Sequence, residues 1–126
     1  MTTLYGPLNS GAAAGADGVA TANTDSAIVL RGAVLGLYVR YNDSPPAGTT
    51  DITIATKGSR APALTLLTIA NAATDGWFWP RVQVHTTAGA AITATYDYAA
   101  IDDKINVNIA QANASDSIDV WLVMDD

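Results

Sequence analysis

Apolar and polar side chains alternate along most of this 126-residue chain, which is the pattern of β-strands with one buried face. Residues 50–56 show it most clearly, with Ile52 and Ile54 set between polar neighbours. The same pattern predicts strands over residues 17–23, 27–30, 33–42, 64–70, 75–85, 92–98, 104–110 and 117–124. Eight or nine short strands without a convincing helix predict an all-β, single-domain antiparallel β-sandwich, with a jelly roll among the favoured topologies.

Three of the predicted strands carry a row of large apolar residues on one face. Their inward-facing residues are expected to be Leu35, Leu37, Val39 and Tyr41, then Ile105, Val107 and Ile109, then Ile118, Val120, Leu122 and Met124. Gly36 interrupts the first of these strands and marks a β-bulge or a close approach of another group. Between strands, residues 42–48 form a loop, because two prolines interrupt pairing there.

Composition supports the same fold class and narrows the function. All twelve acidic residues are aspartate, and lysine occurs only twice, so good helix formers are scarce. The chain has no cysteine, which excludes disulfides and thiolate chemistry. A net charge of -6 argues against nucleic-acid binding. Neither a signal peptide nor a membrane-spanning segment is expected, which favours a soluble protein made in the cytoplasm.

The first 22 residues are expected to form a flexible, extended arm ahead of a sandwich domain over residues 23–126. Residues 9–18 contain no large side chain and should not order by themselves. Leu4, Tyr5 and Leu8 lie beyond this link, where they could anchor the arm to a neighbouring subunit. A frayed terminus is the alternative interpretation.

Residues 75–85 concentrate the unusual side chains. As a single strand, this stretch places Trp77, Trp79, Arg81 and His85 on one face, together with Gln83. The opposite face carries Phe78, Pro80, Val82 and Val84. The aromatic, arginine-bearing face suggests a surface that packs against another molecule. Equally, the two tryptophans could cap the end of the sandwich, with Arg81 and His85 bonded to nearby carbonyls.

Catalytic chemistry has little support in the sequence. There is one histidine and no nucleophile motif, so no catalytic residue and no cofactor are predicted. Carboxylate pairs depend on separation in space, which leaves a small hydrolase as a weak alternative. No metal site is predicted, although a calcium ion bound in a loop stays open. Its candidate ligands are Asp102 and Asp103, Asp116 and Asp119, and Asp125 and Asp126.

Two segments carry a resemblance to a known class of proteins. They are NDSPPAGTTDITI at residues 42–54 and LTLLTIANAATDGWFWPRVQVH at residues 64–85. The chain resembles, over residues 30–124, the capsid decoration (cement) proteins encoded among the head genes of tailed double-stranded DNA bacteriophages. The resemblance implies a structural, non-enzymatic β domain that forms dimers or trimers on the outside of the expanded shell.

The resemblance also implies partners and a location. The expected partners are the major capsid protein and the chain itself as a homo-oligomer, with a trimer favoured and a dimer possible. No nucleic-acid or membrane partner is expected, and the location is the outer capsid surface of the virion. The candidate interface residues are Leu4, Tyr5, Leu8, Trp77, Trp79, Arg81 and His85. The alternative is a receptor- or carbohydrate-binding module of a phage tail or spike, in which Trp77, Trp79 and Trp121 would stack on sugar rings.

Overall fold

The computed structural model describes residues 1–42 and 46–126. Residues 43–45, which belong to the predicted proline-containing loop, lie outside the described residues. The strands of the described part are β1 (Thr2–Asn9), β2 (Ala20–Asp25), β3 (Leu30–Tyr41), β4 (Asp51–Thr56), β5 (Thr65–Ile69), β6 (Gly76–Phe78), β7 (Val82–His85), β8 (Ala91–Asp97), β9 (Ala99–Asp103), β10 (Ile105–Ala112) and β11 (Ile118–Asp125). Within those residues, no helix is long and apolar enough to cross a lipid bilayer.

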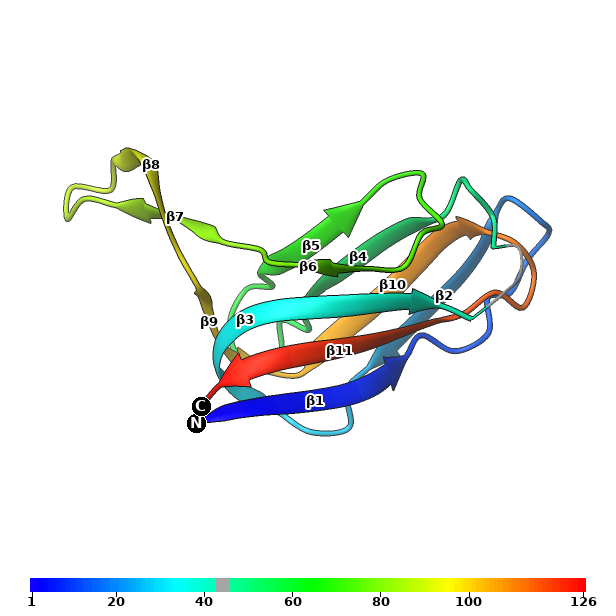
Figure 1. The fold of residues 1–126 in the computed structure, drawn as a ribbon, viewed down its shortest axis with the longest axis horizontal. Coiled ribbons are helices and arrows are strands. Elements are labelled where there is room, and N and C mark those ends of the chain that lie inside the picture. Colours follow the sequence, from blue (N-terminus) through cyan, green and yellow to red (C-terminus); the bar gives the residue numbers. More distant parts are fainter. Residues whose placement is uncertain (43–45) are drawn as a thin grey trace.

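Eight of the strands form two facing antiparallel sheets (Figure 1). The first sheet has the order β1-β11-β3-β6, and the second has the order β2-β10-β4-β5. Among these eight strands, neighbours in the chain lie in opposite sheets, as β1 and β2 or β10 and β11 do, except β4 and β5, which pair within the second sheet. This is the strand order of a jelly roll. The predicted antiparallel β-sandwich is therefore confirmed, and β9 adds a further strand beside β3.

The core lies between the two sheets, where the alternating apolar residues meet. Nearly all the predicted inward positions are buried, including Ile52 and Ile54 and the predicted faces of β10 and β11. Leu35 is the exception, because the register of β3 shifts by one residue against β11 between Gly36 and Val34. Leu35 is the extra residue of this bulge, and Val34 takes its place in the core.

The N-terminal segment is a strand of the sandwich, so the flexible arm expected over residues 1–22 is wrong. β1 pairs with β11 along most of its length, and Leu8 is buried with only 9% of its surface exposed. The glycine- and alanine-rich link is ordered by backbone hydrogen bonds rather than by large side chains. In it, the Ala13 N–H donates to the Asp116 carbonyl at 2.8 Å and the Gly18 N–H donates to the Ala112 carbonyl at 2.9 Å.

Three other strand predictions need correction. Residues 75–85 are not one strand: β6 ends at Phe78 and β7 begins at Val82, because Pro80 has no N–H for a sheet and the chain leaves β3 there. Residues 27 and 28 form a bend, and β3 begins at Leu30. Asp102 and Asp103, candidate ligands of a calcium ion bound in a loop, instead end the strand β9, which pairs with the first half of β3.

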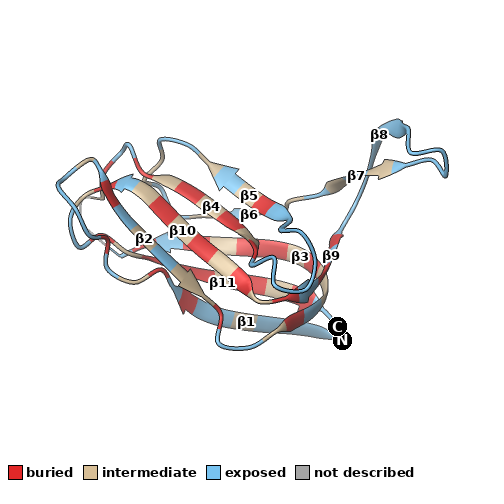
Figure 2. Cartoon of the chain, turned by 180° about the vertical axis from the view of Figure 1, so that it is seen from behind, coloured by how far each residue is buried: buried red, intermediate tan, exposed pale blue. Residues whose placement is uncertain are grey.

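The β7–β8 hairpin, residues 82–97, projects away from the sandwich (Figure 1). It forms a separate two-stranded sheet. Figure 2 shows that it carries almost none of the buried positions that fill the two main sheets, and all seven residues of β8 are exposed. The projecting part of this molecule is thus in the second half of the chain, not at its N-terminus.

Candidate interaction surface

An aromatic face crosses the outer side of the first sheet, and we define it as Tyr38, Trp77, Trp79 and Trp121. Tyr38 of β3 is in register with Trp121 of β11 on one side and with Trp77 of β6 on the other. Their ring centroids are 5.8 Å and 5.0 Å from that of Tyr38, in tilted arrangements. The jelly-roll order of β11, β3 and β6 therefore places side chains from three distant sequence positions in one row.

Trp79 extends the row beyond the end of β6. Its ring stacks on that of Trp77 with a centroid distance of 5.6 Å and an interplanar angle of 12°. It also covers Gly36, where an added Cβ would lie only 2.4 Å from Trp79 Cε3. The expectation that Gly36 marks a bulge or a close approach is confirmed on both counts. Trp77 and Trp79 still expose 50% and 57% of their surfaces.

A shallow apolar hollow of about 240 Å³ opens on the aromatic face, lined by Leu4, Tyr38, Trp77 and Trp121. Leu4 comes from β1 and is 60% exposed. Beside it, Gly6 makes room for the Trp121 ring, because a Cβ there would lie 3.0 Å from Trp121 Cδ1 and 2.8 Å from the Val120 carbonyl oxygen. None of the four lining residues carries a formal charge.

One ion pair borders the aromatic face. Arg40 Nη2 donates to Asp119 Oδ2 at 2.6 Å, and the Arg40 Cζ lies 4.9 Å from the Trp121 ring centroid. Asn9 Nδ2 donates to the other carboxylate oxygen at 2.8 Å. Burial raises the pKa of the Asp119 carboxyl, but the hydrogen bonds from Asn9 and Arg40 outweigh it and hold the pKa below its usual value. Both charged groups thus serve to fix β1, β3 and β11 together.

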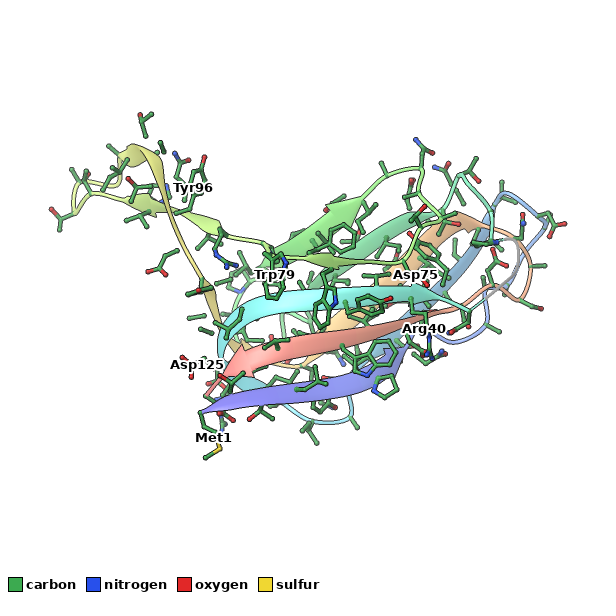
Figure 3. All side chains as sticks on the ribbon, in the orientation of Figure 1. Met1, Arg40, Asp75, Trp79, Tyr96 and Asp125 are labelled. Atoms are coloured by element: carbon green, nitrogen blue, oxygen red, sulfur yellow. The ribbon has the colours of Figure 1, made fainter. Side chains whose placement is uncertain are left out.

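The hairpin is weakly paired, and its one formal charge lies at its base, on Asp97. Residues 82–96 contain no Asp, Glu, Lys or Arg. Register pairs join β7 and β8 at only three positions, because a bulge of the four residues between Ala91 and Tyr96 lies opposite Val84 alone. Ala94, within that bulge, has a left-handed φ of 58°. Tyr96 is 59% exposed and lies out on the hairpin, away from Trp79 and the sheet (Figure 3).

Arg81 holds the base of the hairpin. Its Nη1 donates to the carbonyl of Leu35 at 2.9 Å, and its Cζ lies 4.1 Å from the centroid of the Tyr98 ring. Leu35 is the bulged residue of β3 and has no register partner on β11, and its carbonyl accepts the hydrogen bond from Arg81. Arg81 and Tyr98 thereby connect the two ends of the hairpin to β3.

The structure brings together only part of the predicted interface set. Leu4, Trp77 and Trp79 share the outer side of the first sheet, whereas Tyr5 packs partly buried against the core and Leu8 lies within it. The prediction for Leu8 is therefore corrected, since β1 turns it inward. His85 is exposed at the end of β7.

Four residues of the exposed aromatic and hairpin surface were not among the predicted interface residues: Tyr38, Ile92, Tyr96 and Tyr98. Trp121 was considered only for sugar stacking. Tyr96 on β8 and Tyr98 directly after it alternate with other residues in the sequence, which is a usable signal for an exposed aromatic face there. Tyr38 lies beside Trp77 of β6 and Trp121 of β11 because of the order of the strands, which the sequence pattern does not predict.

The aspartates considered for metal binding are engaged in the fold. Asp102 accepts from Arg31 Nε at 2.6 Å and pairs with Arg60. Asp103 accepts hydrogen bonds from the Ser59 hydroxyl and from the N–H groups of Gly58 and Lys104. The Ser59 hydrogen bond, followed by the backbone donors, lowers the pKa of Asp103 to about 2. Across residues 1–42 and 46–126, no group of three or more acidic, histidine or cysteine side chains is placed to hold a metal ion.

Asp102 and Asp103 also line an open cleft of about 660 Å³ between β9 and the loop around Pro62. Apolar side chains and Arg60 make up much of the rest of its lining. Because Arg31 and Arg60 bind the first carboxylate, and Ser59 with the neighbouring N–H groups binds the second, both carboxylates hold structure together here. This arrangement does not assemble a nucleophile with a base.

The comparisons with known proteins assign no family. No family model matches the chain, and no curated protein matches it. Among solved structures, it is similar to exo-β-1,3-galactanase from Phanerochaete chrysosporium, determined with galactose, at 12% sequence identity and a TM-score of 0.31. The similarity covers 98% of this chain but 29% of that enzyme, so the chain spans less than a third of the enzyme's length. A similarity this low carries no activity to this chain.

Proposed function

We propose that this chain is a non-enzymatic structural protein that decorates the outer surface of a tailed-phage capsid as a homo-oligomer. The observation that carries the proposal is the pair of exposed apolar elements on one small jelly roll, the aromatic face and the projecting hairpin. Exposed tryptophans and tyrosines around an apolar hollow have the composition of protein-contact surfaces. The resemblance of residues 30–124 to phage decoration proteins supplies the class of partner.

The rest of the surface suits a protein that is added to a shell in many copies. A net charge of -6 keeps free copies soluble and apart. Contacts repeated by capsid symmetry need only modest affinity each, because avidity multiplies them. The partners in this proposal are a second copy of the chain and the major capsid protein, which the decoration protein would bridge between neighbouring subunits.

Co-sedimentation with capsid shells tests the proposed function. Purified protein is mixed with expanded and unexpanded shells assembled from the major capsid protein of the same genome. We expect saturable pelleting with expanded shells, displacement by excess unlabelled protein, and shells that withstand a higher temperature once decorated. Protein that stays in the supernatant with both kinds of shell would contradict the proposal.

A carbohydrate-binding role is the second candidate, and one observation favours it. The stacked rings of Trp77 and Trp79 and the Arg40–Asp119 pair place aromatic and polar groups close together on an exposed sheet. Against it, the hollow is smaller than the roughly 300–1,000 Å³ of small-ligand sites. Its lining is almost wholly apolar. A glycan array probed with the wild type and with Trp77→Ala tests this second candidate. A carbohydrate-binding role requires a glycan that the wild type binds and the variant does not.

A further inference from the structure

We infer that the hairpin of one copy packs into the apolar hollow of a second copy, so that the hollow is a self-association site. The inference deepens the proposed function by naming the contact that builds its homo-oligomer. It starts from the hairpin, in which all seven residues of β8 are exposed and Val82, at the base, packs against the core. An isolated two-stranded hairpin is marginally stable in water, and this one is joined by only three register pairs.

The hairpin offers the side chains that such a contact needs. Ile92 and Tyr96 on the hairpin, and Tyr98 directly after it, are large, apolar or aromatic, and exposed. The register pairs Val82–Asp97 and His85–Ala91 give the paired part of the hairpin a length of about 10 Å, at roughly 3.3 Å per residue of β7. Three strands spaced about 4.8 Å apart, β11, β3 and β6, are also about 10 Å wide. A hairpin of this length is therefore able to lie across the three strands that carry Trp121, Tyr38 and Trp77 in a neighbour.

The hollow offers the matching recess. Leu4, Tyr38, Trp77 and Trp121 line it, and its volume of about 240 Å³ suits an inserted side chain better than a free ligand. The half-exposed rings of Trp77, Trp79, Tyr96 and Tyr98 each leave on the order of 100 Å² for a partner. Each side of the contact therefore contributes about 200 Å² of aromatic surface, and the rest of the roughly 800 Å² per partner of a standard interface comes from the hairpin strands and the sheet around the hollow.

Charge identifies the occupant as a second copy of this chain. Two copies with a net charge of -6 repel one another over most of their surfaces. Residues 82–96 of the hairpin carry no formal charge, with Asp97 at the base as the one charged residue, and the residues that line the hollow carry none. These two uncharged, apolar surfaces are where acidic copies can meet at little electrostatic cost. In such an oligomer, the hairpin of each copy fills the hollow of the next copy. This contact is heterologous, and it forms a closed ring when the rotation between neighbouring copies brings the last copy back to the first.

Cysteine cross-linking tests the contact directly, since the natural chain contains no cysteine. Leu4→Cys, at the rim of the hollow, and Ile92→Cys, on the hairpin, are made in two differently tagged chains that are co-expressed without any capsid protein. A short bismaleimide is then added. We expect a cross-linked species that contains both tags. A Val19→Cys chain is the matched control, because Val19 is 66% exposed on the link between β1 and β2.

Self-association measured by light scattering provides the second readout. Tyr96→Asp places a charge on the hairpin, and we expect it to weaken association at least about tenfold, while Val19→Asp leaves association unchanged. A wild type that is monomeric at about 100 µM would overturn the inference. The inference would also be overturned if Ile92→Cys cross-linked equally to Leu4→Cys and to Val19→Cys, or if cross-links formed only between the hairpins of two copies. Binding of the uncross-linked protein to shells would then still support the proposed function.

Discussion

The sandwich and the hairpin are built from the same kinds of residue but use them in opposite ways. In β3 and β11 the alternating apolar residues, such as Leu37 and Leu122, are wholly buried between two sheets. In β8 the residues Ile92 and Tyr96 also alternate with polar ones, yet every residue is exposed. Alternation therefore makes a strand with one apolar face. That face is buried only where a second surface packs against it.

The largest expected effect comes from Leu37→Ala in the sandwich. Leu37 is fully buried, so removing its side chain leaves a cavity and should lower the free energy of unfolding by about 2–5 kcal/mol. The matched change in the hairpin, Ile92→Ala, should cost less than about 0.5 kcal/mol in the monomer. Urea unfolding of both variants at low protein concentration measures the contrast. Equal losses would mean that the hairpin folds into the body.

The next effect is expected at Gly36 of β3, which is covered by Trp79 from the segment that leads from β6 to the hairpin. Gly36→Ala adds a Cβ into the space of the Trp79 ring and should lower the free energy of unfolding by about 1–3 kcal/mol. The displaced tryptophan should also change its fluorescence. Gly48→Ala is the control, because no atom lies within 4 Å of its added Cβ. If the two variants unfold alike, Trp79 does not rest on Gly36.

A smaller, local effect is expected from Arg81→Ala. Loss of the bond to the Leu35 carbonyl and of the Tyr98 contact should speed amide exchange in residues 82–97, with a global change of about 1 kcal/mol. Arg31→Ala is the control, since it removes only an exposed pair with Asp102. Unchanged exchange in the hairpin would show that Arg81 does not hold its base.

Acid should weaken the sandwich through its carboxylates. Hydrogen bonds and ion pairs hold the pKa of Asp25, Asp102, Asp103 and Asp119 below the ordinary 3.8, with Asp103 at about 2. As the pH falls below about 4, the unfolded chain binds protons before the folded one, so stability declines toward pH 2. Asp103→Asn should remove part of this decline. Urea midpoints between pH 6 and pH 2 measure it, and a flat wild-type profile would refute the assignment.

The sequence predicted the sandwich well because burial in it follows a simple period of two. Ile52 and Ile54, and the inward faces of β10 and β11, lie where alternation places them. It failed at the N-terminus, because the glycine- and alanine-rich link is ordered by backbone bonds to residues about 90 to 100 positions away, such as Ala112 and Asp116. Side-chain patterns do not report such bonds.

The candidate surface was predictable only in part. Trp77 and Trp79 were expected to share a face and do so, because both lie on the outer side of the sheet. The break at Pro80 was not expected, and it turns the remainder of the stretch into a hairpin that leaves the body. Tyr38 and Trp121 complete the hollow through strand order, a non-local property that alternation along one segment does not encode.

Amide hydrogen exchange as a function of protein concentration tests the central claim most directly. If the hairpin is covered by a second copy, residues 82–97 are protected at high concentration and lose that protection on dilution. Core amides of β10, such as that of Ile109, should keep theirs throughout. Exchange in residues 82–97 that stays fast at every concentration, even where light scattering shows an oligomer, would contradict the account.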